Sequence, residues 1–241
     1  MVVVDIYYMS NISKQDFKNF FKYYKGESQQ ESGVGILYDQ MRDVLKDDTH
    51  EWITTYRSKP AVPEGSNPLT VPYDCQLNNP GGDGWRECFS SSCAMAAMFW
   101  GVIKTPNEYH AVRPKYGDST DASAQIRTLQ SFGLNARFVQ VGSVEKLKAQ
   151  IDRGRPAPVG FLHHGTSSAP SGGGHYILAI GYTDTHLIAH DPYGELDVVN
   201  GGYPKTGGTY GKEIKYSWKD WAPRWSVSND HDGWGLDIVK A

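Results

Sequence analysis

The stretch QLNNPGGDGWRECFSSSCAMAAMFW, Gln76 to Trp100, decides the fold, because a loop rich in Asn, Gly and Pro runs directly into an apolar segment. From Cys88 onward this segment consists mostly of helix-forming residues, and it is followed by Gly101, a residue type that often ends helices. A cysteine stands where the loop meets the apolar segment. The sequence therefore predicts a helix that begins at Cys88, with the thiol at its N-terminus.

The predicted position of Cys88 has a chemical consequence. The N–H groups of a first helical turn have no partner within the helix, and together with the helix dipole they favour a thiolate over a thiol. The thiolate is the form of cysteine that attacks carbonyl groups. Cys93 lies five residues further on, about 140° round the helix, and is expected to be an inert core residue. Cys88 is therefore the candidate nucleophile.

A cysteine nucleophile needs a base, and residues 172–194, GGGHYILAIGYTDTHLIAHDPYG, offer one. Two apolar runs indicate antiparallel strands, and a turn centred near Thr183 places His175 directly opposite Asp191. Opposed residues share a face of the sheet, with β-carbons about 5 Å apart. A carboxylate at that distance can orient the imidazole and stabilise its charged form. We predict that His175 is the base and Asp191 its orienting acid; a purely structural pair is the alternative.

The loop upstream of the nucleophile holds one more candidate. Acyl transfer places negative charge on the carbonyl oxygen of the substrate, and donors aimed at that oxygen stabilise it. The side-chain amide of Gln76 could donate to it together with the backbone N–H of Cys88. The alternative is that Gln76 is an ordinary exposed loop residue. Of the two, we predict that Gln76 stabilises the oxyanion.

The rest of the chain indicates an α+β protein in two parts. Helical periodicity over residues 12–57 is followed by a stretch rich in Pro, Gly and Ser, so that a boundary is expected near residue 62. We predict a helical module over residues 1–62 and a second domain over residues 63–241, in which helices precede antiparallel strands. Helices are expected at 88–100, 121–132 and 143–154, and strands at 136–141, 156–162, 175–182, 186–194 and within 212–241.

The composition limits the classes of partner and cofactor that we expect. The net charge of −3 gives no reason to expect nucleic acid or anionic lipid. No apolar run approaches the roughly 20 residues that span a bilayer, and the N-terminus lacks the features of a secretory signal. His163 and His164 could ligate zinc with Cys75 or His190, but no HExxH or paired cysteine spacing supports such a site. We expect no nucleic acid, no membrane insertion, no metal and no cofactor.

These residues resemble the double-glycine-leader-peptidase-like branch of the papain-like cysteine peptidases, over roughly residues 68–195. The resemblance lies in the segments VPYDCQLNNP, CFSSSCAM, GGHYILAIGY and HDPYG. It implies a papain-like fold, in which N-terminal helices pack on an antiparallel sheet. It also implies an oxyanion-hole glutamine at Gln76, a nucleophile at Cys88, a base at His175 and an orienting acid at Asp191.

The chain departs from that branch next to the nucleophile. Phe89 follows Cys88 where many members have Gly or Asn, and residues 79–87, NPGGDGWRE, lengthen the approach to the cysteine. Both departures lie at or just before the start of the predicted helix.

The whole chain is also similar to predicted phage lysis proteins that carry this domain, which implies that it cuts peptide bonds in bacterial cell walls. Peptidoglycan peptides are then the expected partner. The protein would be made in the host cytoplasm and act at the bacterial wall or periplasm, with residues 1–62 binding wall or substrate. Two alternatives stay open: a non-enzymatic wall-binding or tail-associated protein with an idle site, and acyl transfer of the transglutaminase type.

Overall fold

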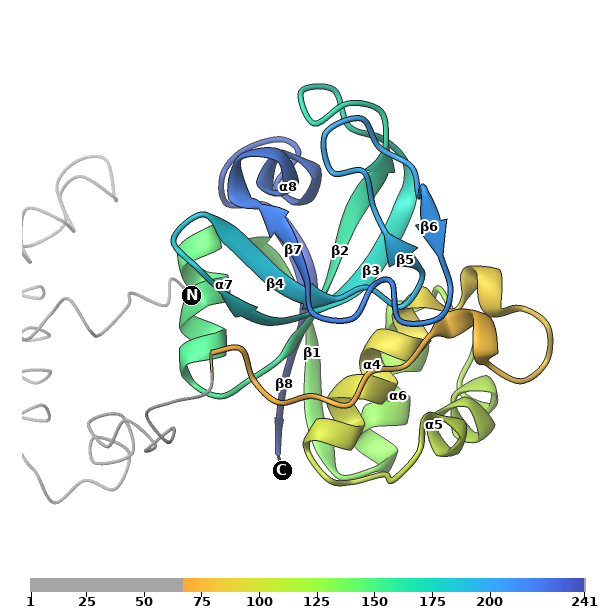
Figure 1. The fold of residues 1–241 in the computed structure, drawn as a ribbon. Helices are drawn as coiled ribbons and strands as arrows, with labels where there is room; N and C mark the ends of the chain where they lie inside the picture. The colour runs from red at the N-terminus through yellow and green to blue at the C-terminus, as the bar shows by residue number, and fades with distance from the viewer. Residues whose placement is uncertain (1–66, 241) are drawn as a thin grey trace, which may run out of the picture. The chain divides into compact units, whose positions relative to one another are not determined.

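The computed structural model describes residues 67–240 (Figure 1). The helical module predicted over residues 1–62 lies outside this range and stays a prediction. Among the described residues, no helix has both the length and the apolar character needed to cross a bilayer.

The helices and strands of the described chain have the following bounds. The α-helices are α4 (Cys88–Phe99), α5 (Pro106–Val112), α6 (Ala122–Ser131), α7 (Val144–Asp152) and α8 (Trp218–Trp225). The strands are β1 (Leu134–Gly142), β2 (Ala157–His164), β3 (Ser171–Tyr182), β4 (His186–His190), β5 (Gly194–Glu195), β6 (Lys205–Thr206), β7 (Ile214–Ser217) and β8 (Gly233–Lys240). Short 3-10 turns occur at η2 (Gln76–Asn78), η3 (Gly84–Arg86) and η4 (Arg113–Lys115).

A six-stranded sheet forms the centre of the fold. Its strand order is β1-β8-β2-β3-β4-β7, and each pairing is antiparallel. Helix α4 packs on β3 and helix α6 on β1, while α8 packs on β2 (Figure 1). Strands β5 and β6 pair separately. Helices packed on an antiparallel sheet confirm the predicted α+β, papain-like fold.

Helix α4 is buried in the core, because it is built almost entirely from small residues and a few large apolar ones. Its residues from Phe89 to Ala97 are buried, which confirms that Cys93 is a core residue. The buried hydroxyl of Ser90 accepts a hydrogen bond from the side chain of Gln125 at 3.0 Å. This internal hydrogen bond allows the polar side chain of Ser90 to be buried in the core.

The predicted helices and most of the predicted strands agree with the structure, but the strand predicted over 186–194 ends at His190, and the prediction near the C-terminus is partly wrong. The predicted helices at 88–100, 121–132 and 143–154 correspond to α4, α6 and α7. The prediction of strands within 212–241 is correct for β7 and β8, but residues 218–225 form helix α8. Ser217 caps that helix by accepting the N–H of Asp220. Trp221 and Trp225, one helical turn apart, are both buried on the side facing the core.

Candidate active site

The predicted base and its predicted acid contact each other in the structure. His175 lies on β3, and Asp191 follows the end of β4 directly. The Nε2 atom of the His175 ring is 2.8 Å from Oδ1 of Asp191. The two residues are 6% and 0% exposed. A carboxylate and an imidazole this close and this buried form a strongly coupled pair.

The turn that brings these residues together differs from the prediction. The sequence analysis centred it on Thr183, but the N–H of Thr183 donates to the carbonyl of His186 at 2.8 Å. The turn is therefore centred between Asp184 and Thr185. This turn shifts the pairing of β3 with β4 by three residues relative to the prediction, and a bulge in β3 reduces the shift by one residue. The predicted register is wrong by two residues, and His175 is not directly opposite Asp191.

The predicted contact between His175 and Asp191 is still present, because the predicted register is wrong by an even number of residues. Leu178 pairs with His190, so Asp191 continues opposite Ile177, and His175 lies two residues further along β3. Side chains two residues apart share a face of the sheet. Diagonal neighbours across two strands are within reach of long side chains. An odd shift would have turned the imidazole to the other face.

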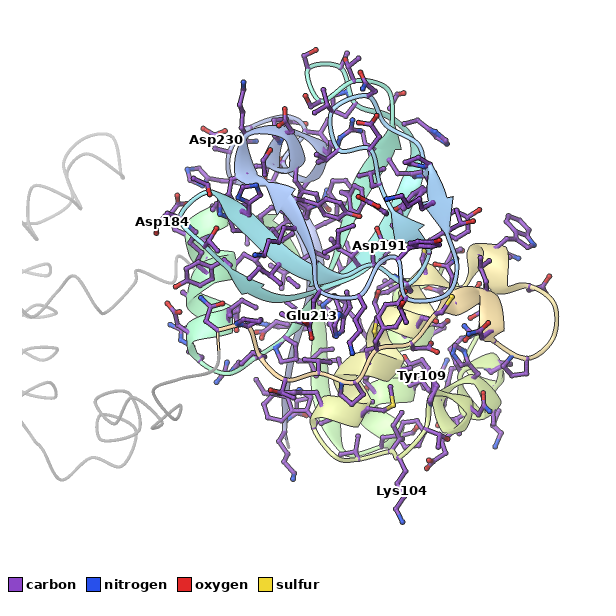
Figure 2. The ribbon with its side chains drawn as sticks, viewed as in Figure 1. Lys104, Tyr109, Asp184, Asp191, Glu213 and Asp230 are labelled. Atoms are coloured by element: carbon purple, nitrogen blue, oxygen red, sulfur yellow. The ribbon has the colours of Figure 1, made fainter. Side chains whose placement is uncertain are left out.

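The Asp191 carboxylate is held by four donors, of which the sequence analysis found only His175. Oδ1 also accepts the N–H of Tyr193 at 3.0 Å, and Oδ2 accepts the hydroxyls of Tyr203 at 2.9 Å and Tyr216 at 3.0 Å. Figure 2 shows Asp191 beside the segment that carries β5 and β6. Four hydrogen bonds stabilise a buried charge and fix the direction in which it faces the imidazole.

The candidate nucleophile is the first residue of α4, as predicted. Cys75, Cys88 and Cys93 are all free thiols, but only Cys88 is partly exposed. The first intrahelical bond runs from the N–H of Ser91 to the carbonyl of Glu87. The N–H groups of residues 88–90 therefore lie in the first turn, where α-helical bonding leaves donors free to bind an anion.

His175 carries a proton at neutral pH in this environment. Burial of the ring lowers its pKa, but the Asp191 carboxylate and the Cys88 side chain outweigh burial and raise the pKa of His175 to about 10. Because Nε2 is bound to Asp191, Nδ1 is the ring nitrogen available to Cys88. The His175 ring therefore lies against the Asp191 carboxylate, and the Cys88 side chain is close enough to contribute to its raised pKa.

Gln76 joins the two halves of the site. Its Nε2 donates to the carbonyl of Gly84 at 2.7 Å, in the turn just before Cys88. Its backbone N–H donates to the carbonyl of Pro192, the residue after Asp191. Gln76 is 1% exposed, so the alternative of an exposed loop residue is wrong. A carboxamide nitrogen carries two hydrogens, of which the bond to Gly84 uses one.

A pair of stacked aromatic rings sets α4 against β3 beside the site. Phe89 follows Cys88 and Tyr176 follows His175, and their rings stack with centroids 3.6 Å apart and an interplanar angle of 5°. Each ring is thus one residue from a side chain of the candidate pair. The phenylalanine that departs from the family pattern therefore contacts β3 next to His175.

We expect Phe89→Leu, which keeps an apolar side chain but removes the stack, to lower kcat for peptide hydrolysis about tenfold with a smaller change in KM. The physical reason is that α4 can then rotate or slide by a fraction of an ångström relative to His175. Steady-state kinetics on a peptide substrate measure this. Phe138→Leu, at an exposed position on β1, is the matched control, and an unchanged kcat for Phe89→Leu would show that the stack positions nothing.

A second histidine lies beside the pair. The ring centroid of His163 is 5.9 Å from that of His175. Burial, followed by the charges of His175 and His164, lowers the pKa of His163 to about 4, so this ring is neutral. Within residues 67–240 there is no group of three or more His, Cys, Asp or Glu side chains suited to a metal ion.

Comparisons with known proteins bear on the fold and the family of this chain. The chain is similar to the crystal structure of a protein described as a C39-like peptidase from Bacillus anthracis, with 13% identity, a TM-score of 0.50, and coverage of 73% of this chain and 99% of that one. It is also similar to a double glycine motif protease from an AMS/PCAT transporter in complex with the leader peptide (14% identity, TM-score 0.46, 73% and 96% coverage). A third similar structure is the peptidase domain of Streptococcus ComA, a bi-functional ABC transporter (17%, 0.43, 65% and 93%).

At these identities the likeness to solved structures concerns the fold. No curated protein matches the chain. The model of the Peptidase_C39 like family matches residues 68–225, a range that contains all four predicted site residues and more than half of the chain. The chain therefore belongs to the Peptidase_C39-like family and is a cysteine peptidase.

Proposed function

We propose that this cysteine peptidase hydrolyses peptide bonds of bacterial peptidoglycan through an acyl-enzyme formed on Cys88. The observation that supports the chemistry is the His175 ring, which Asp191 binds on one side and Cys88 approaches on the other. A thiolate beside an imidazolium is the reactive form of a cysteine peptidase. No cofactor takes part in this chemistry.

The proposed reaction has two steps. The Cys88 thiolate attacks the scissile carbonyl, and the developing oxyanion accepts hydrogen bonds from the Cys88 backbone N–H and the free N–H of Gln76. The His175 imidazolium then donates its proton to the leaving amine, and the bond between the carbonyl carbon and nitrogen breaks. Neutral His175 next takes a proton from water, which attacks the thioester and regenerates the thiolate. Asp191 orients the ring throughout.

The substrate is proposed from the sequence. The resemblance of the chain to phage lysis proteins supports a cell-wall peptide as the substrate. We further propose that residues 1–62 bind the wall or the substrate, because a separate module is the usual way for a hydrolase to be held at an insoluble polymer.

Mass spectrometry of fragments released from purified peptidoglycan tests the substrate. We expect each cleavage to leave a free carboxylate and a free amine, with the gain of one water molecule. Acyl transfer would instead leave a new amide. Protein whose Cys88 has been blocked by alkylation is the control and should release nothing. Cleavage of an unfolded protein substrate, with no fragments from peptidoglycan, would reject the substrate while retaining the peptidase.

A further inference from the structure

A buried charged cluster lies behind the candidate site and has no part in the chemistry described above. His110 of α5 stands between two carboxylates: its Nε2 is 3.7 Å from Oδ2 of Asp74, and its Nδ1 is 3.6 Å from Oε2 of Glu87. Arg113 binds the other oxygen of Glu87 at 2.6 Å. Asp74, Glu87 and His110 are 7%, 7% and 8% exposed. Water therefore solvates these charges poorly.

Only a doubly protonated ring suits this position. A neutral imidazole has one N–H donor and one acceptor nitrogen, so it would turn a lone pair toward one of the two carboxylates. Among residues 67–240, Oδ2 of Asp74, Oε2 of Glu87 and Nε2 of His110 are buried without any closer hydrogen-bond partner. With the imidazolium and Arg113 as two positive charges against two carboxylates, the cluster is neutral. Loss of the ring proton leaves one buried negative charge.

The two carboxylates belong to the two chain segments that build the candidate site. Asp74 precedes Gln76 by two residues, and Glu87 immediately precedes Cys88. No backbone hydrogen bond of the described chain joins Asp74 to Glu87, so His110 is the side chain that bridges them. A change in the charge of His110 thus acts on the oxyanion segment and on the start of α4 together.

We propose that the His110 imidazolium is a positioning residue that holds the segment of Gln76 against the helix start that carries Cys88, and that deprotonation of His110 weakens this link. The inference rests on the proposed roles of Cys88 and Gln76. It adds a residue that touches neither the substrate nor the reacting atoms but sets the distance between the nucleophile and the oxyanion donor.

The direction of the pH dependence follows from the groups around His110. Burial lowers its pKa, but Asp74 and Glu87 outweigh burial, and the net pKa of His110 is raised. Beyond Glu87 the facing charge is Arg113. The neighbouring Tyr109 is neutral because burial raises its pKa well above the ordinary value. A raised folded-state pKa means that the stabilisation is complete below the pKa of unfolded histidine and is lost as the pH rises through the folded-state value.

His110→Gln tests the link, because it removes the charge and keeps a polar side chain. The full chain is assayed for kcat and KM on the peptide substrate and, without substrate, for the rate at which iodoacetamide alkylates Cys88. We expect kcat and the alkylation rate to fall about tenfold near pH 6 to 7, with KM nearly unchanged. Wild type and variant should then converge as the pH rises, because wild-type His110 loses its proton too. His231→Gln, at an exposed position, is the control.

The outcomes separate this inference from its alternatives. If the ratio of wild-type to variant kcat is above one but the same at every pH, His110 has a merely structural role. If that ratio is one at every pH, His110 has no role. Either result overturns the inference. If His110→Gln does not fold, Asp74→Asn should lower the pH at which the loss of the His110 proton reduces kcat and the alkylation rate of Cys88, and an unchanged pH for this loss overturns the inference. If peptidoglycan is not cleaved but alkylation behaves as expected, only the proposed substrate fails.

Discussion

Replacing Cys88 by alanine will abolish peptide hydrolysis, with a loss in kcat of about 10⁴- to 10⁶-fold. The variant has no group to form the acyl-enzyme, and the two other thiols cannot substitute. Cys93 is fully buried, and burial raises the pKa of its thiol far above the ordinary value; Cys75 is buried as well. The release of peptide fragments under single-turnover conditions measures the loss.

A second cysteine variant separates chemistry from folding. Cys88 is partly exposed at the helix start, so its truncation opens little cavity and should change the free energy of unfolding by less than about 0.5 kcal/mol. Cys93→Ala removes a buried atom from the centre of α4 and should cost about 1 kcal/mol of stability while leaving kcat nearly unchanged. Thermal unfolding and kinetics on both variants test this crossed pattern, and full activity of Cys88→Ala would reject the nucleophile.

The helices and strands that the sequence predicts well are those with local signals. Helix α4 begins at Cys88 and is followed by Gly101, as the composition and the stop signal predict. Helix α8 was missed because Pro223 inside it and the preceding strand residues favour extended structure. The N-cap at Ser217 and the spacing of Trp221 and Trp225, one helical turn apart, are local helix signals, and the burial of both rings outweighs the presence of Pro223.

The site shows the same division. The cysteine at a helix start and the histidine and aspartate on neighbouring strands are visible in the sequence, because they lie within single supersecondary units. Tyr216 binds Asp191 from 25 residues away, and His110 meets Asp74 only because α5 packs against the segment before η2. Side chains that complete a site by tertiary contact have no fixed spacing from it, so a single sequence cannot assign them.

Asp191→Asn is expected to have the second largest effect, a loss in kcat of about 10²- to 10⁴-fold. Asparagine keeps the shape but removes the charge that orients and stabilises the His175 imidazolium. Tyr203→Phe is the matched control, because it removes one hydrogen bond to the Asp191 carboxylate and keeps the charge. That control should lose about tenfold or less. Equal losses in the two variants would mean that geometry, and not charge, is what Asp191 supplies.

The pH profile of Asp191→Asn distinguishes these contributions most clearly. His175 must hold a proton to release the leaving amine, so activity declines as the pH rises through its pKa of about 10. Burial of the ring lowers this pKa, and the Asp191 charge is one of the contributions that outweigh burial. Removing that charge should therefore lower the pKa and move the alkaline decline about one to three pH units toward neutral. A decline that stays in place would show that Asp191 does not hold the proton on His175.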